Sequence, residues 1–205
     1  MSGAEDPRAL TIPGIPGSLE WHNPPAHWDF QDGALTITAG KTTDWFVDPF
    51  DGRATRNSPM ALFEPAQEFV LSALVTVDHR SKWDAGALVL RVDETTWAKF
   101  ALELSAEGRA TFVSVVTRGR SDDCNSSTVE GHSAYLQSAR SRDAFVFYSS
   151  PDGNAWQIVR SFTLGPARGL RAGFSSQSPT GEGCRATFSN IRYAPKGIAN
   201  IYTGK

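Results

Sequence analysis

The chain has 205 residues, a formal net charge of −2, 20% charged residues and 11% aromatic residues. This length suits a single domain. The balanced charge excludes a nucleic-acid-binding protein that relies on a basic surface, and the aromatic content excludes a disordered chain. The 12 Phe and six Trp residues, against two Met, favour a sheet-rich protein.

Residues 1–17 contain three Pro and three Gly, and we predict an irregular lead-in there, followed by one domain over residues 18–205. The chain shows no secretory signal pattern, and no apolar stretch approaches the roughly 18 residues of a membrane helix. Two cysteines, Cys124 and Cys184, are too few for a disulfide framework. We therefore expect free thiols in a reducing cytoplasm, with one bridge between them as the alternative.

From residue 18 onward, short segments rich in Val, Phe, Thr, Tyr and Trp alternate with turns that contain glycine. The predicted strands are 35–39, 45–47, 68–78, 85–92, 96–105, 109–118, 134–139, 143–149, 155–164, 170–175 and 184–193. No window shows a helical stripe with caps at both ends. So many short strands predict an all-β jelly-roll sandwich of two curved antiparallel sheets.

The segment 96–104 is the most informative strand, because its side chains alternate between two faces. One set is apolar and predicts the core between the sheets: Ala98, Phe100, Leu102 and Leu104. The other set places an indole, an amine and a carboxylate in a row on the opposite face: Trp97, Lys99 and Glu103. In the preceding strand, Leu88 and Leu90 are expected to face the core, and Arg91 the other side.

Several motifs occur in a fixed order between about residues 21 and 193. They are Trp21-His22-Asn23-Pro24-Pro25, Thr43-Asp44-Trp45-Phe46, the segment 85–91, Trp97-Ala98-Lys99 with Glu103, Ser114-Val115-Val116-Thr117 with Ser121-Asp122, and Ser150-Pro151-Asp152-Gly153 with Trp156. In this order the chain resembles an uncharacterised domain family that includes the "regulation of enolase" protein. The resemblance implies a concanavalin A-like lectin/glucanase sandwich, but no established activity.

Two positions depart from that family. An aromatic residue is common after Ser121-Asp122, where this chain has Asp123 and Cys124, and a basic residue is common at Gln137. Both positions are expected near the groove, so the ligand need not be shared with the family.

The sequence lacks the motifs of serine hydrolases, phosphate-binding loops and dinucleotide-binding folds, so we predict no cofactor. Its histidines, His22, His27, His79 and His132, show no metal-like spacing, and we predict no metal. A glycosidase needs two carboxyl groups. The predicted face offers only Glu103, whose neighbour Lys99 should favour the ionised form; Asp44 or Asp122 could supply a partner.

We predict non-catalytic binding of a carbohydrate or related polyhydroxylated small molecule. The predicted ligand-binding residues are Asp44, Trp45, Arg91, Trp97, Lys99, Glu103, Ser121 and Asp122. Trp97 and Trp45 would stack on the ligand, and the polar groups would satisfy its hydroxyls.

Each of these residues also has a structural interpretation. Trp97 could cover the sheet beneath a loop, Lys99 and Glu103 could be a solvated ion pair, and Arg91 could pair with Glu103. Two other functions stay open: a glycoside hydrolase or lyase that uses Glu103, and a protein-interaction module that regulates a metabolic enzyme. Nucleic-acid and membrane partners are not expected.

Overall fold

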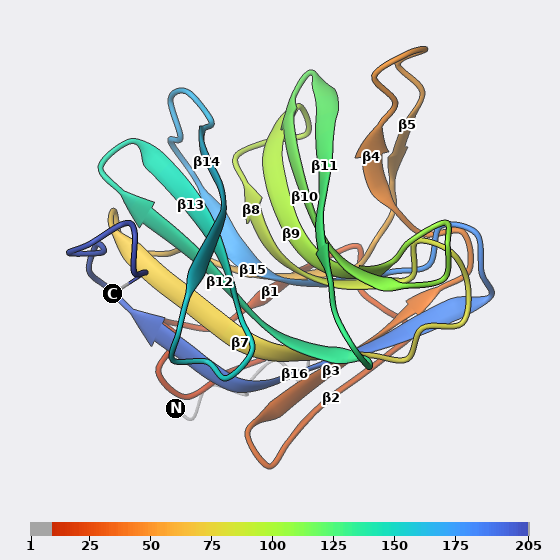
Figure 1. The fold of residues 1–205 in the computed structure, drawn as a ribbon, viewed down its shortest axis with the longest axis horizontal. Helices are drawn as coiled ribbons and strands as arrows, with labels where there is room; N and C mark the ends of the chain where they lie inside the picture. The colour runs from red at the N-terminus through yellow and green to blue at the C-terminus, as the bar shows by residue number, and fades with distance from the viewer. Residues whose placement is uncertain (1–9, 205) are drawn as a thin grey trace, which may run out of the picture.

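The computed structural model describes residues 10–204, which form β-strands joined by turns (Figure 1). In the first half of the chain the strands are β1 (Glu20–His22), β2 (His27–Gln31), β3 (Ala34–Gly40), β4 (Trp45–Val47), β5 (Ala54–Arg56), β6 (Met60–Phe63), β7 (Phe69–Val77) and β8 (Ala85–Arg91). The remaining strands are β9 (Thr96–Leu104), β10 (Ala110–Arg118), β11 (Arg120–Thr128), β12 (Ser133–Ser141), β13 (Ala144–Ser150), β14 (Gln157–Thr163), β15 (Arg171–Gln177) and β16 (Gly183–Ala194).

These strands form two seven-stranded antiparallel sheets. The first sheet has the order β1-β6-β15-β8-β9-β10-β11, and the second has the order β14-β13-β12-β7-β16-β3-β2. Strands β4 and β5 pair only with each other and form a separate hairpin, which stands above one side of the molecule in Figure 1. The predicted all-β jelly-roll sandwich is confirmed.

The core between the sheets confirms the alternation that the sequence predicts for β9. Ala98, Phe100 and Leu102 are buried there, whereas Leu104, at the end of the strand, is half-buried. Phe100 stacks on Phe147 of the second sheet with ring centroids 5.1 Å apart. An aromatic pair of this kind contributes about 0.5–1.5 kcal/mol beyond the apolar area that it buries.

Gly86 shows how closely the two sheets approach in this core. A Cβ atom at this position would lie 2.8 Å from the Cβ of Ala186 and 2.9 Å from a methyl group of Val75, both in the second sheet. Since such contacts are too short for carbon atoms, a glycine is needed at this position for the packing between the sheets.

Strand β11 was not among the strands predicted from the sequence. It is the outermost strand of the first sheet and pairs with β10 alone. Almost all of its side chains are exposed, so it lacks the apolar alternation by which the sequence reveals a strand. Polar side chains on an edge strand also oppose pairing with another chain.

The described part of the predicted lead-in, residues 10–17, has no regular strand but seals one side of the core. Leu10, Ile12 and Ile15 are buried in the main apolar cluster, and Leu10 pairs with Leu19. Residues 1–9 lie outside the described part of the chain. Among residues 10–204 there is no helix with the length and apolar character needed to cross a membrane.

Candidate functional site

The β4–β5 hairpin covers part of the outer face of the first sheet, which is the face turned away from the second sheet. A second apolar cluster forms beneath it: Trp45, Met60, Leu62, Ala85, Ala87, Val89, Trp97, Ala101, Val113 and Val115. Side chains from β11 attach the hairpin to the sheet. Ser121 Oγ accepts a hydrogen bond from Val47 N at 2.9 Å, and the Arg120 guanidinium donates to the Pro49 carbonyl at 2.8 Å.

This cover buries both tryptophans that were expected to stack on a ligand. Trp97 is 2% exposed and Trp45 is 1% exposed, and their rings meet edge to face at 6.4 Å. The expectation of two open stacking platforms is therefore wrong. Alternation along β9 assigns Trp97 to the outer face correctly, but it carries no information about the hairpin that packs on that face.

Beside this cluster lies a pocket of about 500 Å³. The hairpin contributes Asp44, Phe46, Asp48 and Arg53, the sheet contributes Lys99, Glu103, Val113, Val115, Asp123, Asn125 and Gln177, and two loops contribute Trp83, Pro179 and Thr180. The volume falls within the range of small-molecule sites. Of the predicted residues, the pocket brings together Asp44, Lys99 and Glu103.

A chain of polar contacts crosses the floor of the pocket. Lys99 is 4% exposed, and its Nζ donates to Gln177 Oε1 at 2.8 Å and to Asp44 Oδ1 at 3.0 Å. Gln177 Nε2 in turn donates to Glu103 Oε2 at a longer 3.4 Å. Because a buried ammonium ion is costly without partners, Asp44 and Gln177 stabilise the charge of Lys99 in this position.

Glu103 carries the largest electrostatic perturbation in the pocket. Burial raises its pKa to about 8; the charges of Asp44 and Asp123 act in the same direction, and Lys99 opposes them. The expectation that Lys99 keeps this carboxyl ionised is therefore wrong, because loss of hydration outweighs the nearby cation. At neutral pH the carboxyl is mostly protonated, so it can both donate and accept a hydrogen bond.

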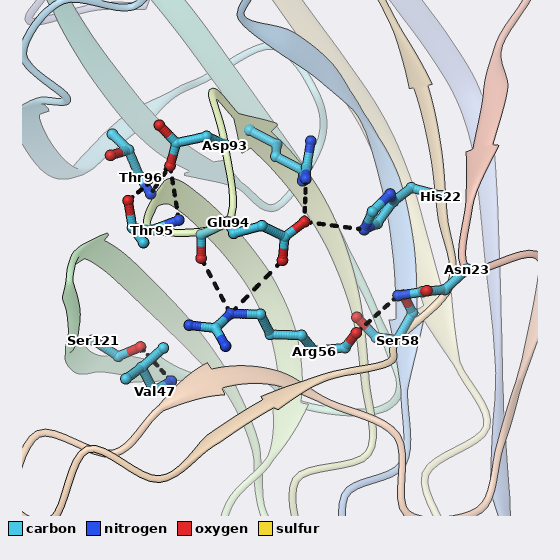
Figure 2. A network of polar contacts seen from close by, with 11 residues as sticks. His22, Asn23, Val47, Arg56, Ser58, Asp93, Glu94, Thr95, Thr96 and Ser121 are labelled. Carbon is cyan, nitrogen blue, oxygen red and sulfur yellow. Dashed lines mark hydrogen bonds and ion pairs between the residues drawn. The ribbon is translucent and has the colours of Figure 1, made fainter.

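Arg91 lies at the other end of the outer face, and it pairs with Glu94 instead of Glu103. Its guanidinium also lies over the Trp45 ring, 5.7 Å from the centroid. Figure 2 shows Glu94 between His22 and Arg56, which approach its carboxylate to 3.9 Å and 3.8 Å. This is a mostly exposed ion-pair network outside the pocket.

Ser121 and Asp122 also lie outside the pocket. Ser121 is buried and holds Val47 of the hairpin (Figure 2). Asp122 pairs in register with Val116, which faces the inter-sheet core, and it forms an ion pair with Arg160 at 3.1 Å. Its neighbour Asp123 faces the pocket instead, because consecutive residues of a strand point to opposite faces.

Several pocket residues were not predicted from the sequence, and Trp83 is the most prominent of them. It is 41% exposed and lies in the turn between β7 and β8, with a positive φ of 67°. Its polar neighbours Lys82 and Asp84 were the available signal for an exposed loop. Gln177 lies two residues beyond the end of the predicted strand 170–175. Because side chains alternate along a strand, extending the prediction to Gln177 would have placed this side chain on the outer face, like that of Ser175.

Gln137, Cys124 and Cys184 do not line the pocket. Gln137 was expected near the groove, but it lies in the second sheet and donates to the Gly204 carbonyl of the C-terminal segment at 3.1 Å. Cys124 is exposed and Cys184 is buried, and both are free thiols. Within residues 10–204, no group of three His, Cys, Asp or Glu side chains lies close enough together to hold a metal ion.

Solved structures with the same architecture include proteins of several kinds. A functionally unknown protein from Saccharomyces cerevisiae superposes with a TM-score of 0.80 at 23% identity, covering 86% of this chain and 96% of that one. A GH43 protein from Bacillus licheniformis gives 0.65 at 19% identity, covering 83% of this chain but 35% of that protein. Lectin I-B4 from Griffonia simplicifolia gives 0.54 at 10% identity, covering 86% and 92%. These likenesses establish the concanavalin A-like sandwich.

Sequence comparison is more specific. The chain is 26% identical over 172 residues to "Regulation of enolase protein 1" from Saccharomyces cerevisiae. The aligned region covers 82% of this chain and 85% of that protein. The family model described as "Protein of unknown function (DUF1349)" matches residues 21–196. This match covers most of the chain and confirms the resemblance found in the ordered motifs. The chain therefore belongs to the DUF1349 family of proteins of unknown function.

Proposed function

We propose that this protein binds a carbohydrate or a related polyhydroxylated small molecule in the pocket beneath the β4–β5 hairpin, without catalysis. The observation that carries the proposal is the row of Lys99, Gln177 and Glu103 along the pocket floor. These groups offer both donors and acceptors, which suits hydroxyl groups that also donate and accept. Lys99 has three N–H donors, of which the contacts within the floor use two, so a ligand hydroxyl can add to these contacts whereas an apolar ligand cannot.

The walls of the pocket support the same ligand class. Trp83 is the exposed aromatic side chain of the lining and can stack on the apolar face of a sugar ring. Asp123 and Asn125 of the edge strand β11 line the same pocket. A ligand in this pocket would have both a stacking surface and hydrogen-bonding groups available to it.

The test is calorimetric titration of a sugar panel with the full chain and a matched pair of variants. Asp123→Ala removes a carboxylate from the pocket, whereas Asp122→Ala removes its neighbour on the other face of the same strand. We expect Asp123→Ala and Trp83→Ala to weaken binding and Asp122→Ala to leave it unchanged. Absence of binding to every sugar, or equal losses in the two aspartate variants, would overturn the proposal.

A second candidate is glycoside hydrolysis or a lyase reaction with Glu103. The raised pKa of Glu103 favours it, because a carboxyl that stays protonated near neutral pH can act as a general acid. Asp44 and Asp123 line the same pocket and are ionisable partners. Release of product from aryl glycosides or oligosaccharides, abolished in Glu103→Gln, would establish catalysis; binding without product would leave the binding function.

Regulation of a metabolic enzyme is the third candidate, and the name of the yeast relative favours it. A stable protein interface needs a broad complementary surface. The exposed large apolar side chains of residues 10–204 are Phe50, Trp83, Ile158, Ile201 and Tyr202. Co-purification with enolase from cell extract is the corresponding test.

The two free thiols favour a reducing compartment, and we accordingly place this function in the cytoplasm. Imaging of the tagged full chain in intact cells tests that assignment.

A further inference from the structure

Strand pairing brings two histidines together outside the pocket. His79 follows β7 and His132 immediately precedes β12, and these strands pair antiparallel with Thr76 opposite Ser133. The two Nδ1 atoms lie 3.4 Å apart, with ring centroids at 5.6 Å and planes inclined by 49°. The two histidines are 53 positions apart in the chain, so no local sequence pattern links them.

The separation of the two nitrogens suits a shared metal ion better than a direct hydrogen bond. Hydrogen bonds to nitrogen donors are usually about 2.7–3.2 Å long, so 3.4 Å is long for an N–H···N contact. Two imidazoles that bind Zn²⁺ at about 2.0–2.1 Å in tetrahedral geometry place their nitrogens about 3.3–3.4 Å apart. The spacing therefore requires little rearrangement of either ring.

The surroundings of His79 leave its Nδ1 as the nitrogen available to a ligand. Its Nε2 is buried without a hydrogen-bond partner. Metal ions bind neutral imidazole through a nitrogen lone pair, and Nδ1 is the atom through which each ring approaches the other.

Asp78, the residue before His79, does not add a third ligand. Its carboxylate accepts a hydrogen bond from the Arg80 guanidinium at 2.6 Å, and in the described part of the chain no third His, Cys, Asp or Glu side chain converges with the two histidines. This arrangement supplies two protein ligands, and water would complete the coordination.

We propose that His79 and His132 form a two-imidazole site for a divalent transition-metal ion of the Zn²⁺ class. The site lies outside the lining of the carbohydrate pocket and stands independently of the function proposed there. It joins the turn that follows β7 to the turn that precedes β12. Bound metal would therefore cross-link two turns at one end of the second sheet.

The experiment titrates the full chain with Co²⁺, followed by its visible absorption, and with Zn²⁺, followed by calorimetry. The variants are His132→Ala at an exposed position and His79→Gln at a half-buried one; His27→Ala, an exposed histidine on β2, is the matched control. We expect saturable binding of one ion, lost in the first two variants and retained in the control. No saturable binding by the unmodified chain, or unchanged binding in a correctly folded His132→Ala protein, would overturn the site.

Discussion

The two ends of β9 present side chains to the same outer face of the first sheet, yet their surroundings differ sharply. Around Trp97 the free space amounts to about 10 Å³, close to the room that one water needs. Around Glu103 the pocket measures about 500 Å³. The alternation of a strand therefore determines on which face of the sheet a side chain lies. Whether that side chain belongs to an apolar core or to an open pocket depends on the element that packs on that face.

The largest expected effect is at the closed end. Trp97→Ala removes a fully buried indole from the second apolar cluster, and we expect a loss of about 3–5 kcal/mol in the free energy of unfolding. Denaturant unfolding followed by circular dichroism measures it. Trp83→Ala, at the open end, should stay within about 0.5 kcal/mol of the unmodified protein. Similar losses in both variants would contradict the distinction between the two ends.

At the open end, the dependence of the free energy of unfolding on pH should show that the Glu103 carboxyl is neutral in the folded protein. Glu103 has a pKa of about 8 in the folded protein, against an ordinary value of 4.5. The folded state therefore holds a proton that the unfolded state loses, so stability is greatest below pH 4.5 for this group and falls as pH rises towards 8. The slope reaches about 1.4 kcal/mol per pH unit. Unfolding curves across this range should lose that decline in Glu103→Gln, and an identical decline in the variant would refute the shift.

The hairpin's attachment predicts an intermediate effect. Ser121→Ala removes the acceptor of the buried Val47 N–H, and we expect a loss of about 1–3 kcal/mol. Increased quenching of tryptophan fluorescence by acrylamide would show that Trp45 and Trp97 become more accessible. Ser126→Ala, farther along the same strand with its side chain exposed, is the control. Equal quenching in the two variants would show that Ser121 does not hold the hairpin down.

The smallest effect is expected in the ion-pair network around Glu94. This carboxylate is 52% exposed, so Glu94→Gln should cost at most about 1 kcal/mol. The difference from the unmodified protein should shrink in high salt, because solvent ions screen exposed pairs. A loss of stability that is larger than this and independent of salt would contradict the prediction, because it would show that the network contributes as much as the buried contacts around Trp97.

Sequence reasoning succeeded where apolar alternation is strong. It assigned both faces of β9 correctly, because Ala98, Phe100 and Leu102 must bury their side chains between the sheets. It failed for β11, an edge strand whose exposed faces leave no apolar period, and so it chose Asp122 where Asp123 lines the pocket. A one-residue error in register moves a side chain to the opposite face.

The remaining errors concern contacts between distant segments. No local sequence pattern predicts that residues 45–56 fold over Trp97. The same is true of the pocket that Trp83 lines together with Asn125. The pKa of Glu103 was misjudged for the same reason, since the sequence shows the neighbouring Lys99 but not the burial that outweighs it. Such properties depend on the assembled sandwich.

The β4–β5 hairpin pairs with neither large sheet, although it supplies four of the pocket's lining residues: Asp44, Phe46, Asp48 and Arg53. Insertions or exchanges in this hairpin would reshape one wall of the pocket while every ladder of the sandwich stays intact. Homologues could thus diverge in ligand preference while their scaffolds still superpose. Transplanting this hairpin between family members would then be a practical way to transfer selectivity.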